Sequence, residues 1–267
     1  MTAKVVLITG ASSGIGLATA ELLYEAGFIV YGTSRRTIDA AQYKFHLIEL
    51  DVNKDDSVAQ AIEKVIQNEG RIDVLINNAG FAIAPAGAEE SSMQQAQAIF
   101  DTNFFGAVRM TRAVLPAMRQ QASGLILNIS SILGLLPTPF GALYSASKHA
   151  LEGYSESLDH ELRSQGIRVS LIEPAYTKTS LGINLLEADA KVSAYDHIRE
   201  KLHKQIIKSI NKSDDPSVVA NTILTVINSR NILPRYTAGK TAKHLKNLRN
   251  FAPVKIFDRL IQRSLKI

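Results

Sequence analysis

The chain has 267 residues, of which 46% are apolar and 21% charged, a composition typical of a soluble globular protein with a sizeable core. It contains no cysteine, which excludes disulfides, thiolate nucleophiles and cysteine-based metal sites, so we expect no metal centre and a cytoplasmic location. The net charge of +5 is uneven, because residues 240–267 carry eight basic residues and one acid.

Short apolar runs rich in β-branched residues recur along the chain and predict parallel strands, whose two faces are both covered. Between them, segments such as 17–24 and 58–65 repeat apolar residues at helical spacing. This alternation indicates an α/β fold with a doubly wound parallel sheet, formed by one domain over residues 1–267. We expect the chain after Pro174 to form helices that cap one edge. The predicted strands are Val5–Ile8, Phe28–Tyr31, Phe45–Leu50, Val74–Ile76, Leu125–Ile129 and Val169–Ile172.

A glycine-rich loop, Thr9–Gly16, follows the first predicted strand and precedes the first helix. Glycines there let the backbone turn sharply and approach a pyrophosphate held at the helix N-terminus. The same residues also match Gly-x-Ser-x-Gly, the nucleophile elbow of serine hydrolases, through Gly10, Ser12 and Gly14. An elbow serine usually follows a central strand and needs a later acid and histidine, so the hydrolase is the less favoured alternative.

The second strand is followed by Ser34 and Arg35. Folds that bind NAD usually place an acid here, which accepts a hydrogen bond from the ribose 2′-hydroxyl. An arginine instead offers a charge-assisted pair of hydrogen bonds to a 2′-phosphate. This position therefore favours NADP(H), although a pair of solvated loop arginines is the ordinary alternative.

Several further motifs follow in order, and together with the glycine loop they resemble those of the short-chain dehydrogenase/reductase superfamily. Thr9–Gly16 matches its TGxxxGxG pattern, Asp51-Val52 follows the third strand, and Asn77–Gly80 matches its NNAG. The resemblance covers residues 4 to about 180 and implies a Rossmann fold. One departure is Ala175, where the family commonly has glycine after the proline that ends the sixth strand.

The family's catalytic Tyr-x-x-x-Lys appears as Tyr144 and Lys148, which lie four residues apart and therefore project from one helix face. The resemblance implies that Tyr144 donates a proton in carbonyl reduction and accepts one in alcohol oxidation. The Lys148 ammonium, together with the positive nicotinamide of the oxidised cofactor, is expected to lower the pKa of the phenol, and Lys148 is also expected to hold the nicotinamide ribose. A second match, Tyr236–Lys240, contains Gly239 and is interpreted as coincidental.

The resemblance also assigns the residues around this pair. Ser131 stands thirteen residues before Tyr144, the family spacing, so it rather than Ser130 is expected to bind the substrate oxygen, while Asn103 helps relay the proton through water. The expected cofactor contacts are Gly10, Ser12, Ser13, Gly14, Ile15, Gly16, Ser34, Arg35, Asp51, Val52, Asn78, Ala79, Gly80, Tyr144, Lys148, Pro174, Thr177 and Thr179.

The substrate is expected to be apolar, because two apolar segments are predicted to line its site. Ile132–Pro137 follows the catalytic serine, and Leu181–Leu186 stands near the start of a substrate lid that is predicted over residues 176–212. A steroid-like, retinoid-like or long-chain ketone or alcohol would suit such walls, whereas helix packing or the face of a homodimer or homotetramer would explain them equally well. A non-catalytic NADP(H)-binding sensor is a second functional class. Such proteins typically lose the tyrosine or the lysine, and this chain retains both.

The basic tail, residues 240–267, is predicted to form a helical extension. It repeats apolar residues at helical spacing between basic ones, and the favoured interpretation is a helix that packs its apolar stripe near the substrate cleft. The alternative is a helix that rests on an anionic membrane. Because the charge is confined to the tail, we expect no nucleic-acid partner. The apolar positions are Phe251, Val254, Phe257, Ile261 and Leu265, and Lys255, Arg259, Arg263 and Lys266 flank them.

Overall fold

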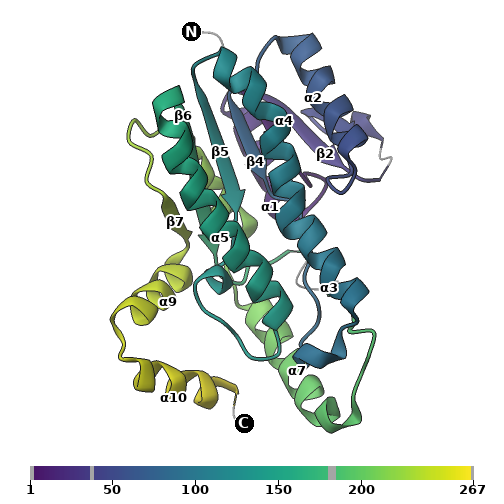
Figure 1. The fold of residues 1–267 in the computed structure, drawn as a ribbon, viewed down its shortest axis with the longest axis vertical. Coiled ribbons are helices and arrows are strands. Elements are labelled where there is room, and N and C mark those ends of the chain that lie inside the picture. The colour runs from purple at the N-terminus through teal and green to yellow at the C-terminus, as the bar shows by residue number, and fades with distance from the viewer. Residues whose placement is uncertain (1–2, 37–38, 180–184, 266–267) are drawn as a thin grey trace.

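The computed structural model of the protein describes residues 3–36, 39–179 and 185–265. Its centre is a seven-stranded sheet in which every neighbouring pair is parallel, in the order β3-β2-β1-β4-β5-β6-β7 (Figure 1). Strand order reverses direction between β1 and β4, and ligands of such sheets bind outside the carboxyl ends of the strands at this point. The strands are β1 (Val5–Ile8), β2 (Ile29–Ser34), β3 (His46–Glu49), β4 (Val74–Asn77), β5 (Gly124–Ile129), β6 (Ile167–Pro174) and β7 (Arg235–Ala238).

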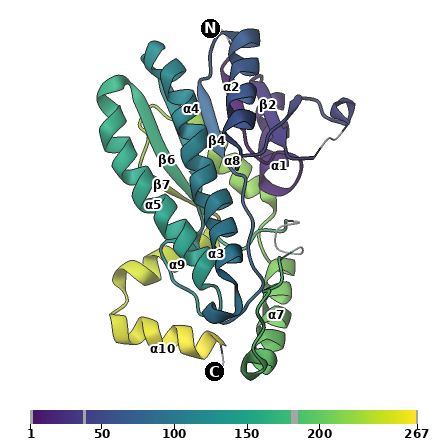
Figure 2. The same cartoon turned by 45° about the vertical axis from the view of Figure 1, so that its right-hand side comes forward.

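Helices cover both faces of the sheet, which explains why its strands are apolar runs without alternation. In β1, Val5 and Leu7 pack into the core on one face, whereas Val6 and Ile8 pack into the core on the other. The first face is covered by α2 (Asp55–Glu69), α4 (Gly106–Gln120) and α5 (Ala142–Leu162), and the second by α1 (Gly14–Glu25) and α8 (Pro216–Ile227) (Figure 2).

The helix boundaries follow local signals in the sequence. Helix α2 begins with Asp55 and Asp56, whose charges suit a helix N-terminus, and ends before Gly70 in the left-handed conformation (φ 71°). Helix α8 begins at Pro216, and the Asp215 side chain accepts a hydrogen bond from the Ser217 N–H. Helix α3 (Met93–Phe100) continues through a π-helical turn, Asp101–Phe105, directly into α4.

The expectation of helices alone after Pro174 is wrong, because β7 adds a strand to the edge of the sheet beside β6. Its four residues, Arg-Tyr-Thr-Ala, are mostly half-buried and form no apolar run, so the pattern gave no strand signal. Helix α8 covers a face rather than the edge, since it packs on α1. Helices α7 (Asp196–Asn211), α9 (Lys240–Phe251) and α10 (Val254–Leu265) lie beyond the carboxyl ends of the strands (Figures 1 and 2).

Candidate functional site

The glycine loop leads from β1 into α1 at the point where strand order reverses. Gly10 and Gly14 have φ values of 67° and 58°, a left-handed conformation that side chains disfavour. A Cβ on Gly16 would lie 2.3 Å from the Gly10 carbonyl oxygen, so only glycine fits there. The bare backbone therefore reaches the N-terminus of α1, where amide N–H groups and the helix dipole favour a phosphate. These residues fit the pyrophosphate of a dinucleotide.

The segment after β4 supports this loop from behind. The Thr9 hydroxyl oxygen accepts hydrogen bonds from the N–H groups of Asn78 and Ala79, both at 2.9 Å. The Asn78 side-chain amide donates to the carbonyl oxygens of Thr9 and Gly10 at 2.9 and 3.0 Å. Gly80 faces Asn103, whose Oδ1 would lie 3.0 Å from an added Cβ. Sequence reasoning assigned no role to Thr9, although it is the first residue of the glycine motif.

Beyond the loop, an open cavity of about 430 Å³ extends towards the chain that follows β6. Ser12, Ser13 and Gly14 line it on one side, and Lys178 and Thr179 on the other. Thr177 is buried and donates a hydrogen bond to the Ala175 carbonyl. Ala175 is absent from the positive-φ residues of the described chain, so the departure from glycine costs no backbone strain there. Lys178 is a cavity residue that the motif comparison missed, because the family pattern leaves its position open.

The residues expected to contact the adenosine lie at or just after the carboxyl ends of β2 and β3. Ser34 ends β2 with a buried hydroxyl that accepts a hydrogen bond from the Arg36 N–H at 3.1 Å. Arg35 is exposed, and among the residues that the structure describes it has no ion-pair partner. Asp51 folds its carboxylate back onto the Asn53 N–H, while Val52 is buried. Arg35 is therefore available to an anion, and its contact with a 2′-phosphate stays a prediction.

The predicted catalytic side chains converge from β5 and α5. Ser131 follows β5, and its hydroxyl accepts a hydrogen bond from the Leu133 N–H and interacts with the Tyr144 phenol. Lys148, one turn after Tyr144 on α5, lies with its Nζ 5.8 Å from the centroid of the tyrosine ring. Ser130 points the other way, towards Glu152. The structure therefore brings Ser131, and not Ser130, to the Tyr144 phenol.

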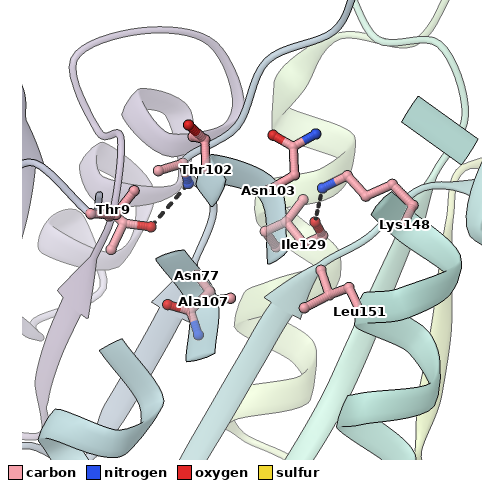
Figure 3. A pocket seen from close by; sticks show the side chains of 10 residues that line it. Thr9, Asn77, Thr102, Asn103, Ala107, Ile129, Lys148 and Leu151 are labelled. Atoms are coloured by element: carbon pink, nitrogen blue, oxygen red, sulfur yellow. Dashed lines mark hydrogen bonds between the residues drawn. The ribbon is translucent and has the colours of Figure 1, made fainter. Parts of the chain in front are cut away.

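Asn103 lies in the π-helical turn between α3 and α4. Its Oδ1 accepts a hydrogen bond from the Phe81 N–H, and its amide donates to the Phe81 carbonyl, both at 2.9 Å. The side chain is thus held in place, and it lines a small cavity together with Lys148, whose ammonium donates to the Ile129 carbonyl at 2.8 Å (Figure 3). The cavity has room for about one water molecule among polar groups, which suits a proton relay through water.

Burial, rather than charge, dominates the titration of this pair. It raises the pKa of Tyr144 to about 12; a hydrogen bond with Ser131 opposes that rise and Tyr176 adds to it. Burial also lowers the pKa of Lys148 to about 8, while the nearby Glu152 carboxylate raises it. The protein groups alone do not lower the phenol pKa, a shift that was expected of Lys148 together with the positive nicotinamide of the oxidised cofactor. They keep Tyr144 protonated at neutral pH, which is the form a general acid requires.

A cluster of charged side chains behind Lys148 went unnoticed in the sequence. Glu152 and Glu173 are buried, and Arg235 of β7 lies 3.0 and 3.7 Å from their carboxylates. Lys246 of α9 pairs with Glu173 at 3.2 Å. Burial raises the pKa of Glu152 to about 7, despite Ser130 and Arg235. The cluster ties α9 and β7 to the helix that carries Tyr144 and Lys148.

The predicted lid packs against the chain that follows β4. Leu186 exchanges backbone hydrogen bonds with Ala82 and Ala84. Glu90 is fully buried, accepts hydrogen bonds from the N–H groups of Gly87 and Val192, and pairs with Arg199 of α7. Leu181, where the lid was predicted to begin, lies outside the described residues. Movement of this segment over a substrate stays a prediction.

A metal-binding cluster and a membrane-spanning helix are both absent from the part of the chain that the structure describes. Within the described ranges no group of three or more His, Asp or Glu side chains is placed to hold a metal ion. No helix in the same ranges combines the length and apolarity needed to cross a bilayer.

Comparisons with known proteins agree with this geometry. The family model for short chain dehydrogenase matches residues 4–190. A 3-ketodihydrosphingosine reductase from Bacteroides thetaiotaomicron is 47% identical over 188 residues, which cover 69% of this chain and 68% of that protein. An uncharacterized oxidoreductase, YusZ, from Bacillus subtilis is 34% identical and covers 99% of both chains.

Solved structures show the same fold. A short-chain dehydrogenase from Streptomyces avermitilis superposes with a TM-score of 0.82 at 33% identity, covering 99% of both chains. ElxO with NADP bound has a TM-score of 0.76 at 26% identity, covering 91% of this chain and all of that one. A Burkholderia phymatum enzyme in complex with NAD has a TM-score of 0.79 at 26% identity, covering 93% of both. With the glycine loop, the Asn77–Gly80 segment and the Tyr144–Lys148 pair all in place on this sheet, the chain belongs to the short-chain dehydrogenase/reductase family of oxidoreductases.

Proposed function

We propose that the protein is an NADPH-dependent reductase that converts a ketone on a long-chain, largely apolar substrate into an alcohol. The observation that carries the proposal is the meeting of Ser131, Tyr144 and Lys148 at the carboxyl end of β5. The serine-hydrolase alternative is dropped, because the chain belongs to an oxidoreductase family and Ser12 lies in the loop that fits a pyrophosphate.

The chemistry is divided between the cofactor and the chain. When bound, the nicotinamide supplies the hydride that is added to the carbonyl carbon. The Ser131 hydroxyl donates a hydrogen bond to the carbonyl oxygen, where negative charge develops, and the Tyr144 phenol donates its proton to that oxygen. Lys148 holds the nicotinamide ribose, and a water beside Asn103 returns a proton to Tyr144. In alcohol oxidation the same groups act in reverse.

The cofactor is held along the carboxyl edge of the sheet. The glycine loop would hold the pyrophosphate, Asp51 and Val52 would contact the adenine, and Thr177 and Thr179 would contact the nicotinamide. An exposed Arg35, with Ser34 at the end of β2 where NAD-binding folds usually place an acid, supports NADPH over NADH. ElxO, a neighbour in structure, binds NADP, whereas the Burkholderia phymatum neighbour binds NAD, so the preference rests on this chain's own residues.

The substitution Arg35→Ala should weaken NADPH binding by about ten- to hundredfold, because it removes a charge-assisted contact to the 2′-phosphate. NADH carries no such phosphate, so its dissociation constant should stay within about twofold in both proteins. Fluorescence titration of each cofactor with both proteins measures the effect. An equal loss of affinity for NADPH and for NADH would contradict the assignment of Arg35 to the 2′-phosphate.

The substrate class is supported by two observations. Leu133 and Leu135 follow Ser131 closely in the sequence and are apolar and only half-buried, whereas Leu136 is buried against α10. The Bacteroides relative is a 3-ketodihydrosphingosine reductase, and its name describes a ketone on a long alkyl chain. We therefore propose a long-chain 3-ketone rather than a steroid-like or retinoid-like substrate.

A turnover assay tests both the activity and the chain length. With NADPH, 3-ketodihydrosphingosine should be reduced with a kcat/KM at least about a hundredfold above that of a short-chain analogue with the same head group, since each buried methylene contributes about 0.8 kcal/mol. Equal values would contradict an apolar substrate. NADPH binding without oxidation by any ketone or aldehyde would instead favour the sensor.

A further inference from the structure

The structure fastens the C-terminal arm, defined here as α9 and α10, beside the reacting groups. Phe257 of α10 is 6% exposed and packs on Ile132 and Leu136, in the segment that directly follows Ser131. The Arg249 guanidinium lies over the Phe257 ring at 5.0 Å, and the Lys246–Glu173 ion pair anchors α9. The favoured sequence interpretation, packing near the substrate cleft, therefore holds for one side of the arm.

The arm also carries apolar side chains that do not pack on the protein. Four large apolar side chains within residues 251–260 are exposed, whereas the remainder of the described chain exposes such residues singly. They are Phe251 (83% exposed), Val254 (76%), Ile256 (50%) and Leu260 (39%). Figure 2 shows α10 lying across the end of the molecule that also carries α7.

Residues along α10 form three adjacent stripes, because positions four apart share a helix face. Phe257 and Ile261 face the body of the protein, and Ile256 and Leu260 form the exposed apolar stripe beside them. Lys255, Arg259 and Arg263 form an exposed basic stripe next to Ile256 and Leu260. An apolar stripe bordered by basic residues is the arrangement of a helix that lies in a membrane interface.

The charge of the arm indicates which partner binds the exposed surface of α10. Residues 240–267 carry eight basic residues and one acid, Asp258, in a chain whose other residues are net acidic. A second copy of the arm would bring like charges together, and an acidic protein partner would leave the apolar stripe without a hydrocarbon counterpart. An anionic bilayer satisfies both stripes, because the apolar side chains enter the acyl region while the basic ones meet lipid phosphates.

We propose that the C-terminal arm docks the protein peripherally on anionic membranes and holds the mouth of the substrate site at the lipid surface. Ile132 and Leu136 lie between the arm and Ser131, so a docked arm places the reacting groups close to the bilayer. The docking itself rests on the arm's own residues. Its use, delivery of a lipid-dissolved ketone, rests on the proposed function.

Vesicle flotation tests the docking without any substrate. The full-length protein should float with vesicles of phosphatidylglycerol and phosphatidylcholine at low salt, and should stay behind at high salt or with phosphatidylcholine alone. Lys255→Glu with Arg259→Glu should lower the partition coefficient at least about thirtyfold, since each basic residue near the surface contributes about a factor of five. Ile256→Gln with Leu260→Gln should lower it about tenfold or more.

Matched variants elsewhere on the surface provide the controls. Lys64→Glu with Arg119→Glu makes the same charge change on exposed sites of α2 and α4, and Met93→Gln makes the same polar change at an exposed site of α3. These controls should float like the unchanged protein. All variants should retain their circular dichroism and their turnover of a short, water-soluble ketone.

Several results would overturn the docking proposal. The proposal is contradicted if the full-length protein never floats, if it binds neutral and anionic vesicles equally, or if the control variants lose as much vesicle binding as the arm variants. Light scattering that shows a dimer lost in Ile256→Gln with Leu260→Gln would assign the surface to a second copy. A protein that floats but reduces no ketone contradicts the proposed function and supports the docking.

Discussion

Replacing Tyr144 by phenylalanine should lower kcat for carbonyl reduction by about a thousandfold or more, because a positioned general acid contributes about 10² to 10⁴ and no neighbouring group can replace its proton. Phenylalanine keeps the ring beside Lys148, and the contacts of the glycine loop are unchanged. The dissociation constant for NADPH should therefore stay within about twofold. Stopped-flow or steady-state measurements of NADPH oxidation, with a binding titration in parallel, give both values.

Tyr236→Phe is the matched control, since Tyr236 belongs to the second Tyr-x-x-x-Lys. Tyr236 lies on β7 and Lys240 begins α9, so the two do not share a helix face. The Tyr236 hydroxyl accepts a hydrogen bond from the Leu233 N–H at 2.8 Å, so its loss concerns local stability alone. Turnover should stay within about twofold of the unchanged protein. A large loss in Tyr236→Phe, with Tyr144→Phe still active, would reverse the assignment.

Asp159→Asn should lower the free energy of unfolding at pH 7 by about 2 to 4 kcal/mol, the largest stability effect that we expect from one polar substitution. The Asp159 carboxylate is 1% exposed and pairs with Arg163, at the end of α5, and with Arg168 of β6, which holds α5 against that strand. It also accepts a hydrogen bond from the Val169 N–H at 2.9 Å. Because α5 carries Tyr144 and Lys148, loss of this contact weakens the support of the site.

The stability difference should depend on pH in one direction. Burial raises the pKa of Asp159, but hydrogen bonds from Arg168, the Val169 N–H and Arg163 outweigh it and lower the pKa to about 2, from 3.8. A carboxyl with a lowered native pKa stabilises the fold above its unfolded value and loses that contribution as pH falls through the native one. The difference in free energy of unfolding between the unchanged protein and Asp159→Asn should be constant from pH 7 to about 4.5 and smaller by about 1 kcal/mol at pH 3.

Urea denaturation of both proteins across this pH range measures the gap. Glu161→Gln removes an exposed carboxylate from the same helix and should change the free energy of unfolding by less than about 0.5 kcal/mol. A gap of that small size for Asp159→Asn, or one that stays constant down to pH 3, would show that the carboxylate is not held as the structure indicates.

The sheet and the cofactor loop could be predicted from local patterns because their physical requirements are local. Val5–Ile8 is apolar at every position because both faces of β1 are covered. Gly10, Gly14 and Gly16 are needed for a turn that side chains cannot adopt or enter. Tyr144 and Lys148 share a face because they are four residues apart on one helix. The charged residues Arg168 and Glu173 flank the predicted run Val169–Ile172, so the prediction of β6 was too short at both ends.

Contacts between residues far apart in the sequence determined the features that local patterns did not predict. Strand β7 is too short and too polar to be recognised alone, and it is a strand because it pairs with β6. Glu173 and Lys246 are 73 residues apart, so their ion pair behind Lys148 has no sequence signature. The raised pKa of Tyr144 and the lowered pKa of Lys148 arise mainly from burial, which depends on how α5 packs.

The C-terminal arm shows the same division within one helix. Apolar and basic residues at helical spacing were enough to predict an amphipathic helix, since that pattern depends only on helix geometry. Which apolar residues meet the protein and which remain open depends on where α10 docks. Phe257 is buried against Ile132, while Phe251 and Val254, which the pattern placed in the same stripe, are exposed. Spacing along a chain determines local conformation, whereas burial, ion pairing and exposure depend on groups that only the folded chain brings together.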